Sequence, residues 1–267
     1  MSRQQKRLEE RKASKLLKTI QKMNSLLYPH QSEPMEDIMN SDRGKIIYPT
    51  GTGKTYIQAA TISLDILHNP IDVKCSLDTS RVYIIQVPRI LLSYQILNET
   101  HKFFNKFGIP AKYLVVHSGT AVDDGKLLNS KNFNMPWMPI DVTTDKEVIK
   151  ENIIKAQQMG AGARPLVIVQ TYHSADKTFD VLDEMNIVAR IVQNDECQYL
   201  VSKEFSHLLK VPCEKMFSYT ATQKNAHHIG MENEELWGKT IAKMSPREAV
   251  ERGLIVRPRN IVQCSKN

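Results

Sequence analysis

The segment from Tyr48 to Thr55, with the sequence YPTGTGKT, constrains this chain more than any other stretch. It follows a short apolar run, residues 44–48, that predicts a buried strand. After it, apolar residues recur at helical spacing until Asn69-Pro70 stops the pattern. A glycine-rich turn between a strand and a helix directs several backbone N–H groups at one point, and the helix dipole adds to their field. The segment therefore predicts a phosphate-binding loop.

Each residue type in this loop has a predicted task. Lys54 would reach the β- and γ-phosphates of a nucleotide, and the Thr55 hydroxyl would hold Mg²⁺. A chance Gly/Thr turn is the alternative, which the flanking strand and helix disfavour. Tyr48 stands where the general pattern has glycine, and this points away from kinases and small GTPases. The loop residues predicted to bind the cofactor are Pro49, Thr50, Gly51, Thr52, Gly53, Lys54 and Thr55.

Two adjacent carboxylates, Asp195 and Glu196, directly follow a second apolar run. Beside a phosphate loop, Asp195 can hold the hydration shell of Mg²⁺, and Glu196 can polarise the water that attacks a γ-phosphate. Alone, such a pair is usually a solvated strand end, but the phosphate loop and the strand–helix units before it favour catalysis. The predicted catalytic residues are Lys54, Asp195 and Glu196, the metal ligands are Thr55 and Asp195, and the cofactors are a nucleotide and Mg²⁺.

Three further polar residues gain meaning from their position. Gln31 lies about twenty residues before the loop, where one amide can both donate to and accept from an adenine edge. As a lone residue it would usually be a surface glutamine. Thr220 and Thr222 follow the predicted strand 215–219, where their hydroxyls can sense a γ-phosphate.

Near-continuous apolar runs at 82–87, 113–116 and 166–169 are typical of parallel strands buried on both faces. They alternate with helical patterns, which predicts an α/β fold with a parallel sheet flanked by helices. We expect a capping box formed by Thr144 and Glu147 to begin one of these helices. Residues 120–140 are the least regular part and are predicted to be a surface insertion.

Charge is concentrated at the N-terminus. Of the net charge of +7, residues 1–22 carry +6, from eight Lys or Arg and two Glu. The pattern predicts a basic helical arm over residues 1–25, which either follows a nucleic-acid backbone or is solvated without a ligand. The four cysteines lack metal-site spacing, and no apolar run reaches the length of a membrane span. A cytoplasmic protein with no membrane partner is the simplest interpretation.

The segments PTGTGKT, VPRILLSYQ, VIVQTYHS, NDECQ and YTAT, in this order, resemble motifs I to III of the superfamily 2 helicases and translocases. YPHQ resembles the adenine-reading motif of that superfamily. The box DECQ and the segment SPREAVERGLIVRP are similar to the branch of type III restriction-enzyme subunits and phage-encoded DNA helicases. The resemblance covers residues 26–260 and implies a P-loop NTPase fold, the N-terminal RecA-like ATPase lobe of such a motor. If it is phage-encoded, it would act in the host cytoplasm.

The resemblance also implies residue roles. It assigns ATP hydrolysis to the loop and the acidic box, and adenine contact to Gln31. Thr220 and Thr222 would couple the ATP site to the nucleic-acid site, with Gln198 as a bridge, although Cys197-Gln198 departs from the best-known box endings. The residues implied to line the nucleic-acid track are Pro88, Arg89, Ser118, Gly119, Thr143, Thr144, Thr171 and His173.

Only 45 residues follow Thr222, and one βαβ unit takes about 30, so a second lobe does not fit. We expect residues 261–267 to begin the connection to a second RecA-like lobe in the same or another chain. Because that lobe supplies arginines to the γ-phosphate, this chain should bind ATP·Mg²⁺, hydrolyse it weakly and unwind nothing alone. DNA is the expected polymer, with RNA as the alternative.

Two other classes of protein fit the sequence less well. A phosphotransferase would need an acceptor site and an arginine-rich lid, for which the sequence offers no stretch. A nucleic-acid-binding module with a vestigial NTPase is disfavoured by the intact Lys54, Thr55, Asp195 and Glu196.

Overall fold

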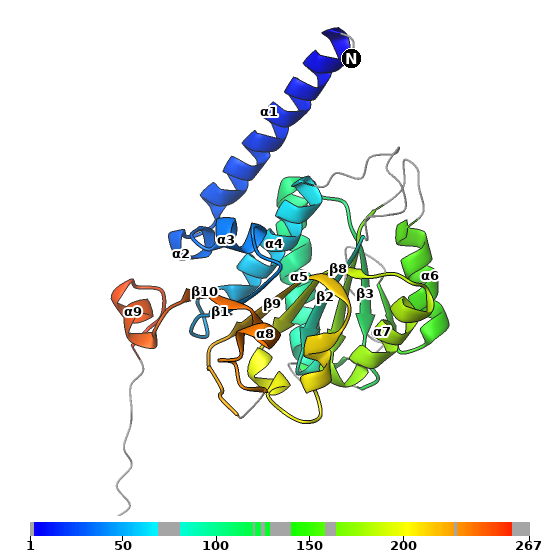
Figure 1. Cartoon of the computed structure of the whole chain (residues 1–267), viewed down its shortest axis with the longest axis vertical. Coiled ribbons are helices and arrows are strands. Elements are labelled where there is room, and N and C mark those ends of the chain that lie inside the picture. The colour runs from blue at the N-terminus through cyan, green and yellow to red at the C-terminus, as the bar shows by residue number, and fades with distance from the viewer. Residues whose placement is uncertain are drawn as a thin grey trace, which may run out of the picture.

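A parallel sheet of eight strands is the centre of the molecule (Figure 1). The computed structural model describes residues 3–68, 81–119, 121–123, 126–128, 140–157, 164–226 and 229–257. The strand order is β10-β1-β9-β8-β2-β7-β3-β6, and each neighbouring pair is parallel. The strands are β1 (Arg43–Ile47), β2 (Val82–Val87), β3 (Lys112–Val116), β6 (Asp141–Thr143), β7 (Leu166–Thr171), β8 (Ala189–Asp195), β9 (Cys213–Thr220) and β10 (Lys239–Lys243).

Helices cover both faces of this sheet, so the strands are apolar on both sides, as the continuous runs predicted. On β2, Tyr83 and Ile85 pack in a core with α4 and α5, whereas Val82 and Ile84 pack in a second core with α6 and α7. The longer helices are α1 (Arg3–Leu26), α4 (Lys54–His68), α5 (Ile90–Phe107), α6 (Lys146–Gln157) and α7 (Ala175–Glu184). The shorter ones are α2 (Pro29–Ser32), α3 (Met35–Met39), α8 (Glu234–Trp237), α9 (Pro246–Glu251) and the 3₁₀ turns η1 (Tyr172–Ser174), η2 (Cys197–Leu200) and η3 (Ser206–Lys210).

A row of buried polar side chains, which we call the amide ladder, crosses four central strands near their carboxyl ends. Gln170 on β7 donates to Gln86 on β2 at 3.3 Å, and Gln86 donates to Asn194 on β8 at 2.8 Å. Asn194 in turn donates to Ser218 on β9 at 3.2 Å. The four residues are direct register partners and are at most 2% exposed. Because an unpaired buried amide is costly, the ladder fixes the register of these four strands.

The α/β fold predicted from the sequence is confirmed, but one local prediction is wrong. α6 does not begin with a capping box of Thr144 and Glu147. Instead the Asp145 carboxylate accepts the Glu147 N–H at 2.9 Å, and Thr143 Oγ1 accepts the Asp145 N–H at 2.9 Å. A carboxylate two residues before the N–H makes a tighter Asx-type turn than the expected box.

The predicted insertion at 120–140 contains an antiparallel pair of strands, β4 (Ala121–Asp123) and β5 (Lys126–Leu128). Its remaining residues, apart from residue 140, lie outside the described part of the chain, as does the predicted connection at 261–267.

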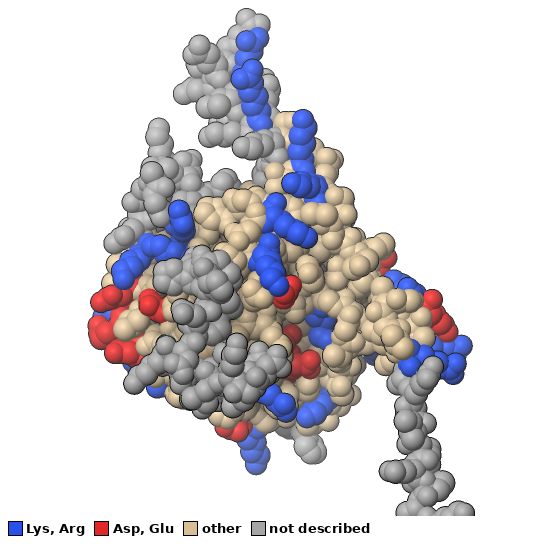
Figure 2. All heavy atoms as spheres, turned by 180° about the vertical axis from the view of Figure 1, so that it is seen from behind, with Lys and Arg blue, Asp and Glu red and all other residues tan. Residues whose placement is uncertain are grey.

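The predicted basic N-terminal helix is confirmed as α1, which extends away from the body of the molecule (Figure 1). Its C-terminal end is anchored by Met23, and Leu27 just after the helix is also buried. Lys and Arg side chains follow the projecting part, and others lie on the body below it (Figure 2). The described basic residues of α1 are exposed, and they are Arg7, Arg11, Lys18 and Lys22. Among the described residues, neither this helix nor any other is both long and apolar enough to cross a bilayer.

Candidate functional site

The predicted phosphate loop lies at the carboxyl end of β1 and leads directly into α4. Gly51 and Gly53 have φ values of 88° and 79°, in the left-handed region that glycine adopts without strain. At Gly53 space matters as well, because a Cβ there would lie 2.3 Å from Gln31 Nε2. Thr52 Oγ1 donates to the Pro49 carbonyl at 2.8 Å and closes the turn. The loop therefore has the curled backbone that a phosphate requires.

Lys54 lies in this loop with a side chain that is only 8% exposed. Its Nζ donates to the Tyr48 carbonyl at 3.0 Å and to the Pro49 carbonyl at 3.4 Å. Burial lowers the pKa of Lys54, while Glu196 and Asp195 act in the opposite direction and favour its charged form. The sequence thus places one buried ammonium between the loop and the acidic pair.

The turn of α2 holds the loop from the other side. A ring nitrogen of His30 lies 2.8 Å from the Thr52 carbonyl, and Gln31 Nε2 donates to the same carbonyl at 3.2 Å. Gln31 Oε1 accepts the Tyr28 N–H at 3.0 Å, so both ends of this amide have protein partners. Contact of Gln31 with adenine stays a prediction. His30 was missed by the sequence analysis, although it stands next to Gln31.

A cavity of about 330 Å³ opens beside this turn. It lies within the range of about 300–1,000 Å³ that is usual for small-molecule sites. Its lining combines the α2 turn, the loop, the first turn of α4 and a segment after α9. The lining residues are Tyr28, His30, Gln31, Gly51, Thr52, Gly53, Tyr56, Gly253 and Leu254.

The acidic pair lies on the other side of the loop, at the carboxyl end of β8. Asp195 Oδ1 accepts Gln58 Nε2 at 2.9 Å, and the Asp195 carbonyl accepts the Tyr172 hydroxyl at 2.6 Å. Thr55 and Asp195 line one cavity of about 380 Å³, so the two predicted metal ligands face the same space. Sequence reasoning missed Gln58, whose amide is indistinguishable in sequence from that of any other helical glutamine.

Burial, reinforced by the neighbouring Glu196, raises the pKa of Asp195 from 3.8 to about 6. The folded chain therefore binds this proton more tightly than the unfolded chain. As pH rises from below 3.8, this group lowers the free energy of unfolding, and the loss levels off above about 6. The rise in pKa corresponds to about 3 kcal/mol.

We therefore expect Asp195→Asn to raise the free energy of unfolding of the ligand-free chain by up to about 3 kcal/mol at pH 7.5. Asparagine does not titrate and keeps an oxygen for Gln58. The gain should shrink towards pH 4, and urea unfolding without Mg²⁺ at both pH values measures it. The exposed Asp176→Asn is the control and should change little. An Asp195→Asn chain no more stable than wild type at pH 7.5 would contradict the expectation.

Glu196 has φ 48°, which is uncommon for a residue other than glycine. Its carboxylate accepts Gln198 Nε2 at 2.8 Å, and Gln198 Oε1 accepts the Thr220 hydroxyl. Thr220 Oγ1 also accepts the Thr222 N–H at 3.0 Å. The residues predicted to couple the two sites thus form a continuous chain from the acidic pair to the end of β9. Their role in coupling stays a prediction.

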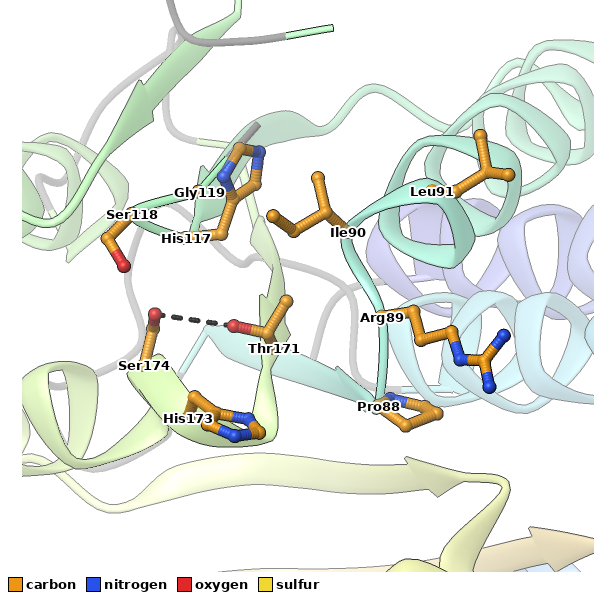
Figure 3. A pocket seen from close by; sticks show the side chains of 10 residues that line it. All are labelled: Pro88, Arg89, Ile90, Leu91, His117, Ser118, Gly119, Thr171, His173 and Ser174. Atoms are coloured by element: carbon orange, nitrogen blue, oxygen red, sulfur yellow. Dashed lines mark hydrogen bonds between the residues drawn. The ribbon is translucent and has the colours of Figure 1, made fainter. Parts of the chain in front are cut away.

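A third cavity, of about 480 Å³, lies at the carboxyl ends of β2, β3 and β7 (Figure 3). Six of the eight residues predicted to contact nucleic acid line it, and they are Pro88, Arg89, Ser118, Gly119, Thr171 and His173. Thr143 and Thr144 are not among its lining residues. Thr143 lies on the edge strand β6, where it is the register partner of Val116 on β3. It therefore lies one strand beyond the three strands whose ends form this cavity.

Ser174 and His117 also line this cavity. Ser174 lies 3.3 Å from the Thr171 hydroxyl, and the two oxygens face each other in Figure 3. His117 is buried, with its Nε2 2.7 Å from the Tyr94 hydroxyl. Hydroxyl groups and a buried histidine therefore lie together among the lining residues of this cavity.

A comparison with protein families identifies the family of this chain. The family model described as the res subunit of type III restriction enzymes matches residues 5–225. The chain belongs to this family. The resemblance drawn from the motifs, to the N-terminal RecA-like lobe of superfamily 2 helicases, is thereby confirmed. No curated protein sequence matches the chain.

Solved structures place this res-family chain on the same fold. A nuclease-deletion mutant of the Type ISP restriction-modification enzyme LlaGI, in complex with a DNA substrate mimic, is 19% identical with a TM-score of 0.60. The match covers 84% of this chain and 20% of that one. The ATP-dependent Type ISP enzyme LlaBIII bound to DNA is 18% identical with a TM-score of 0.63, over 85% of this chain and 15% of that one.

The UvsW helicase from bacteriophage T4 is 16% identical with a TM-score of 0.50, over 81% of this chain and 60% of that one. This res-family chain thus spans a fifth or less of the length of the two restriction-modification enzymes and about three fifths of UvsW.

Proposed function

We propose that this chain is the ATP-binding lobe of a DNA-dependent helicase or translocase, which hydrolyses ATP with Mg²⁺ when joined to a second RecA-like lobe. One observation carries the proposal. Thr55 of the loop and Asp195 of the acidic pair line a single cavity, and Lys54 is buried between the same two segments. This is the arrangement that a phosphate chain and its metal ion need.

The residues fit ATP·Mg²⁺ by their chemistry. The loop offers backbone N–H groups and one ammonium, and the neighbouring cavity offers a hydroxyl and a carboxylate. Mg²⁺ is held in proteins by one or two carboxylates together with substrate phosphates, so a larger cage is unnecessary. Thr55 and Asp195 would hold the Mg²⁺ ion, which would supply positive charge against the charge that develops on the phosphates.

The chain's own residues then have separate tasks. Lys54 contributes positive charge to the γ-phosphate, and Glu196 orients the attacking water through its carboxylate. Gln198 donates to that carboxylate and accepts from the Thr220 hydroxyl, so it connects Glu196 to the end of β9. The arginines that complete the charge balance would come from a second lobe, and their absence lowers turnover by roughly 10³–10⁵. Alone, the chain should be a weak ATPase.

The cavity at the ends of β2, β3 and β7 is the proposed track for nucleic acid. Its Ser118, Thr171 and Ser174 hydroxyls suit phosphate oxygens, and phosphate contacts supply most sequence-independent affinity. DNA is favoured over RNA because the restriction enzymes LlaGI and LlaBIII, which share the fold, were solved with DNA or a DNA mimic.

ATP turnover by this chain, alone and with single-stranded DNA, duplex DNA or RNA, tests the proposal. We expect measurable ATP·Mg²⁺ binding, slow turnover, and a modest increase with DNA that exceeds the increase with RNA. Rapid DNA-stimulated turnover would show that no second lobe is needed. Absence of ATP·Mg²⁺ binding would refute the proposal as a whole.

The exposed basic residues of α1 give a separate prediction. Replacing Arg7, Arg11, Lys18 and Lys22 by Gln should weaken DNA binding at low salt. If all four contact phosphates, the slope of log affinity against log salt should fall in magnitude by about 3. Fluorescence anisotropy at several salt concentrations measures this slope.

The control removes four cations from the body of the domain, each of which already faces a carboxylate. These residues are Lys102, Lys146, Lys155 and Arg247. An equal loss of slope in both quadruple variants would mean that α1 has no special part in binding.

A further inference from the structure

The cavity beside α2 has one wall that comes from the far end of the described chain. Gly253 and Leu254 follow α9, about 200 residues after the phosphate loop, yet both line this cavity together with Tyr28 and Gln31. Ile255 lies close to Gly51 of the loop, because a Cβ built on Gly51 would lie 3.5 Å from Ile255 Cγ2. The segment Gly253–Ile255, which we call the closing segment, thus lies against the loop itself.

The turn at the end of α9 fixes where the closing segment lies. Gly253 has φ 69°, and its N–H donates to the Val250 carbonyl at 3.0 Å. The Leu254 N–H donates to the Ala249 carbonyl at 2.9 Å. These two bonds form a Schellman motif, in which the residue after the glycine packs back on the helix. Leu254 is therefore positioned by backbone geometry as well as by its own contacts.

The segment is also tied to the loop at its start. The Met244 N–H donates at 3.0 Å to the carbonyl of Ile47, the last residue of β1 before the loop. Ser245 caps α9 by accepting the Glu248 N–H at 3.1 Å. Arg252 then lies 3.7 Å from Glu33, beside the α2 turn. Residues 244–255 therefore pass from the end of β1 to the α2 turn and line the cavity at their C-terminal end.

The chemistry of this lining suits a planar base. Tyr28 is 66% exposed and presents an aromatic ring, Leu254 presents an aliphatic group, and the loop presents backbone. Aromatic and aliphatic walls around a few polar groups are typical of sites that hold a ring. The phosphates of the same nucleotide would lie at the adjoining loop.

We propose that the closing segment is part of the nucleotide site, with Leu254 holding the base of ATP against the side of the cavity formed by Tyr28. This rests on the proposed function, because it assumes that the loop binds the triphosphate. It follows that base binding holds in place the segment that leads into residues 258–267.

The affinities for ATP and for inorganic tripolyphosphate, each measured with Mg²⁺, differ by the contribution of the nucleoside part of ATP, which includes the base. Calorimetry or competition binding on the full chain gives the ratio of the two affinities. We expect Leu254→Ala to weaken ATP binding by about tenfold and to leave tripolyphosphate binding unchanged, because only the base loses an apolar contact. Leu254→Met, which keeps similar volume, should restore most of the ATP affinity.

Val256→Ala is the matched control, since Val256 is two residues further on and 90% exposed. It should leave both affinities unchanged. A Leu254→Ala chain that loses ATP and tripolyphosphate equally, or neither, would overturn the proposal. If the wild-type chain bound neither ATP nor tripolyphosphate, the proposed function itself would fail. If Leu254→Ala bound tripolyphosphate normally and kept the wild-type ratio of the two affinities, only the role of Leu254 would be refuted. Circular dichroism melting of each variant confirms that it is folded.

Discussion

Lys54→Ala should reduce ATP turnover by this chain in the presence of DNA by about 10²–10³-fold. The wild-type ammonium is buried beside the Tyr48 carbonyl and close to both carboxylates, so it is already in place for a phosphate chain. Alanine removes the charge without disturbing the two glycines that shape the loop. Binding of ATP·Mg²⁺ to this chain alone should weaken as well, which equilibrium titration measures.

Lys155→Ala is the control for a general loss of positive charge, because Lys155 is exposed and pairs with Glu151. It should leave ATP binding and turnover unchanged. Turnover that survives in Lys54→Ala would contradict the proposed site and would favour a nucleic-acid-binding module with a vestigial nucleotide site.

Glu196→Gln should separate binding from hydrolysis. The substitution keeps the side-chain shape and an oxygen that can accept from Gln198, so the connection to Thr220 is preserved. It removes the negative charge that orients and polarises water. We expect ATP·Mg²⁺ affinity within about threefold of wild type and turnover reduced by about 10²–10³-fold, measured by phosphate release in single and multiple turnover.

Glu204→Gln serves as the comparison, because Glu204 is exposed and lies 3.6 Å from His173 outside the nucleotide site. It should leave turnover unaltered. If Glu196→Gln lowered ATP affinity as strongly as it lowered turnover, Glu196 would belong to the binding set and another group would have to orient the water.

The parts of this molecule that follow local rules were predictable from the sequence. The phosphate loop is contiguous, and its glycines, lysine and threonine have fixed spacing, so the loop could be read without a structure. Asp195 and Glu196 stand out because charged residues directly follow an apolar strand. Parallel packing then brings their strand ends to one edge of the sheet.

The contacts that were missed are those that join segments distant in sequence. Gln58 supports Asp195 across 137 residues, and Leu254 reaches the cavity beside Tyr28 from the other end of the chain. No local pattern distinguishes these residues from other helical glutamines or loop leucines. Thr143 was predicted from its strand-end position alone, which did not reveal that β6 is the edge strand. Its contact with nucleic acid stays a prediction.

In the proposed motor, the amide ladder has a mechanical consequence. Gln86 and Gln170 lie within two residues of the cavity proposed to hold nucleic acid, and Asn194 directly precedes Asp195. A force applied at Pro88 or Thr171 enters strands that are cross-linked side chain to side chain as well as through their backbones. If β2 slipped by one residue along its neighbours, the Gln86 amide would move to the opposite, apolar face of the sheet. In the proposed motor, load would therefore be shared by four strands.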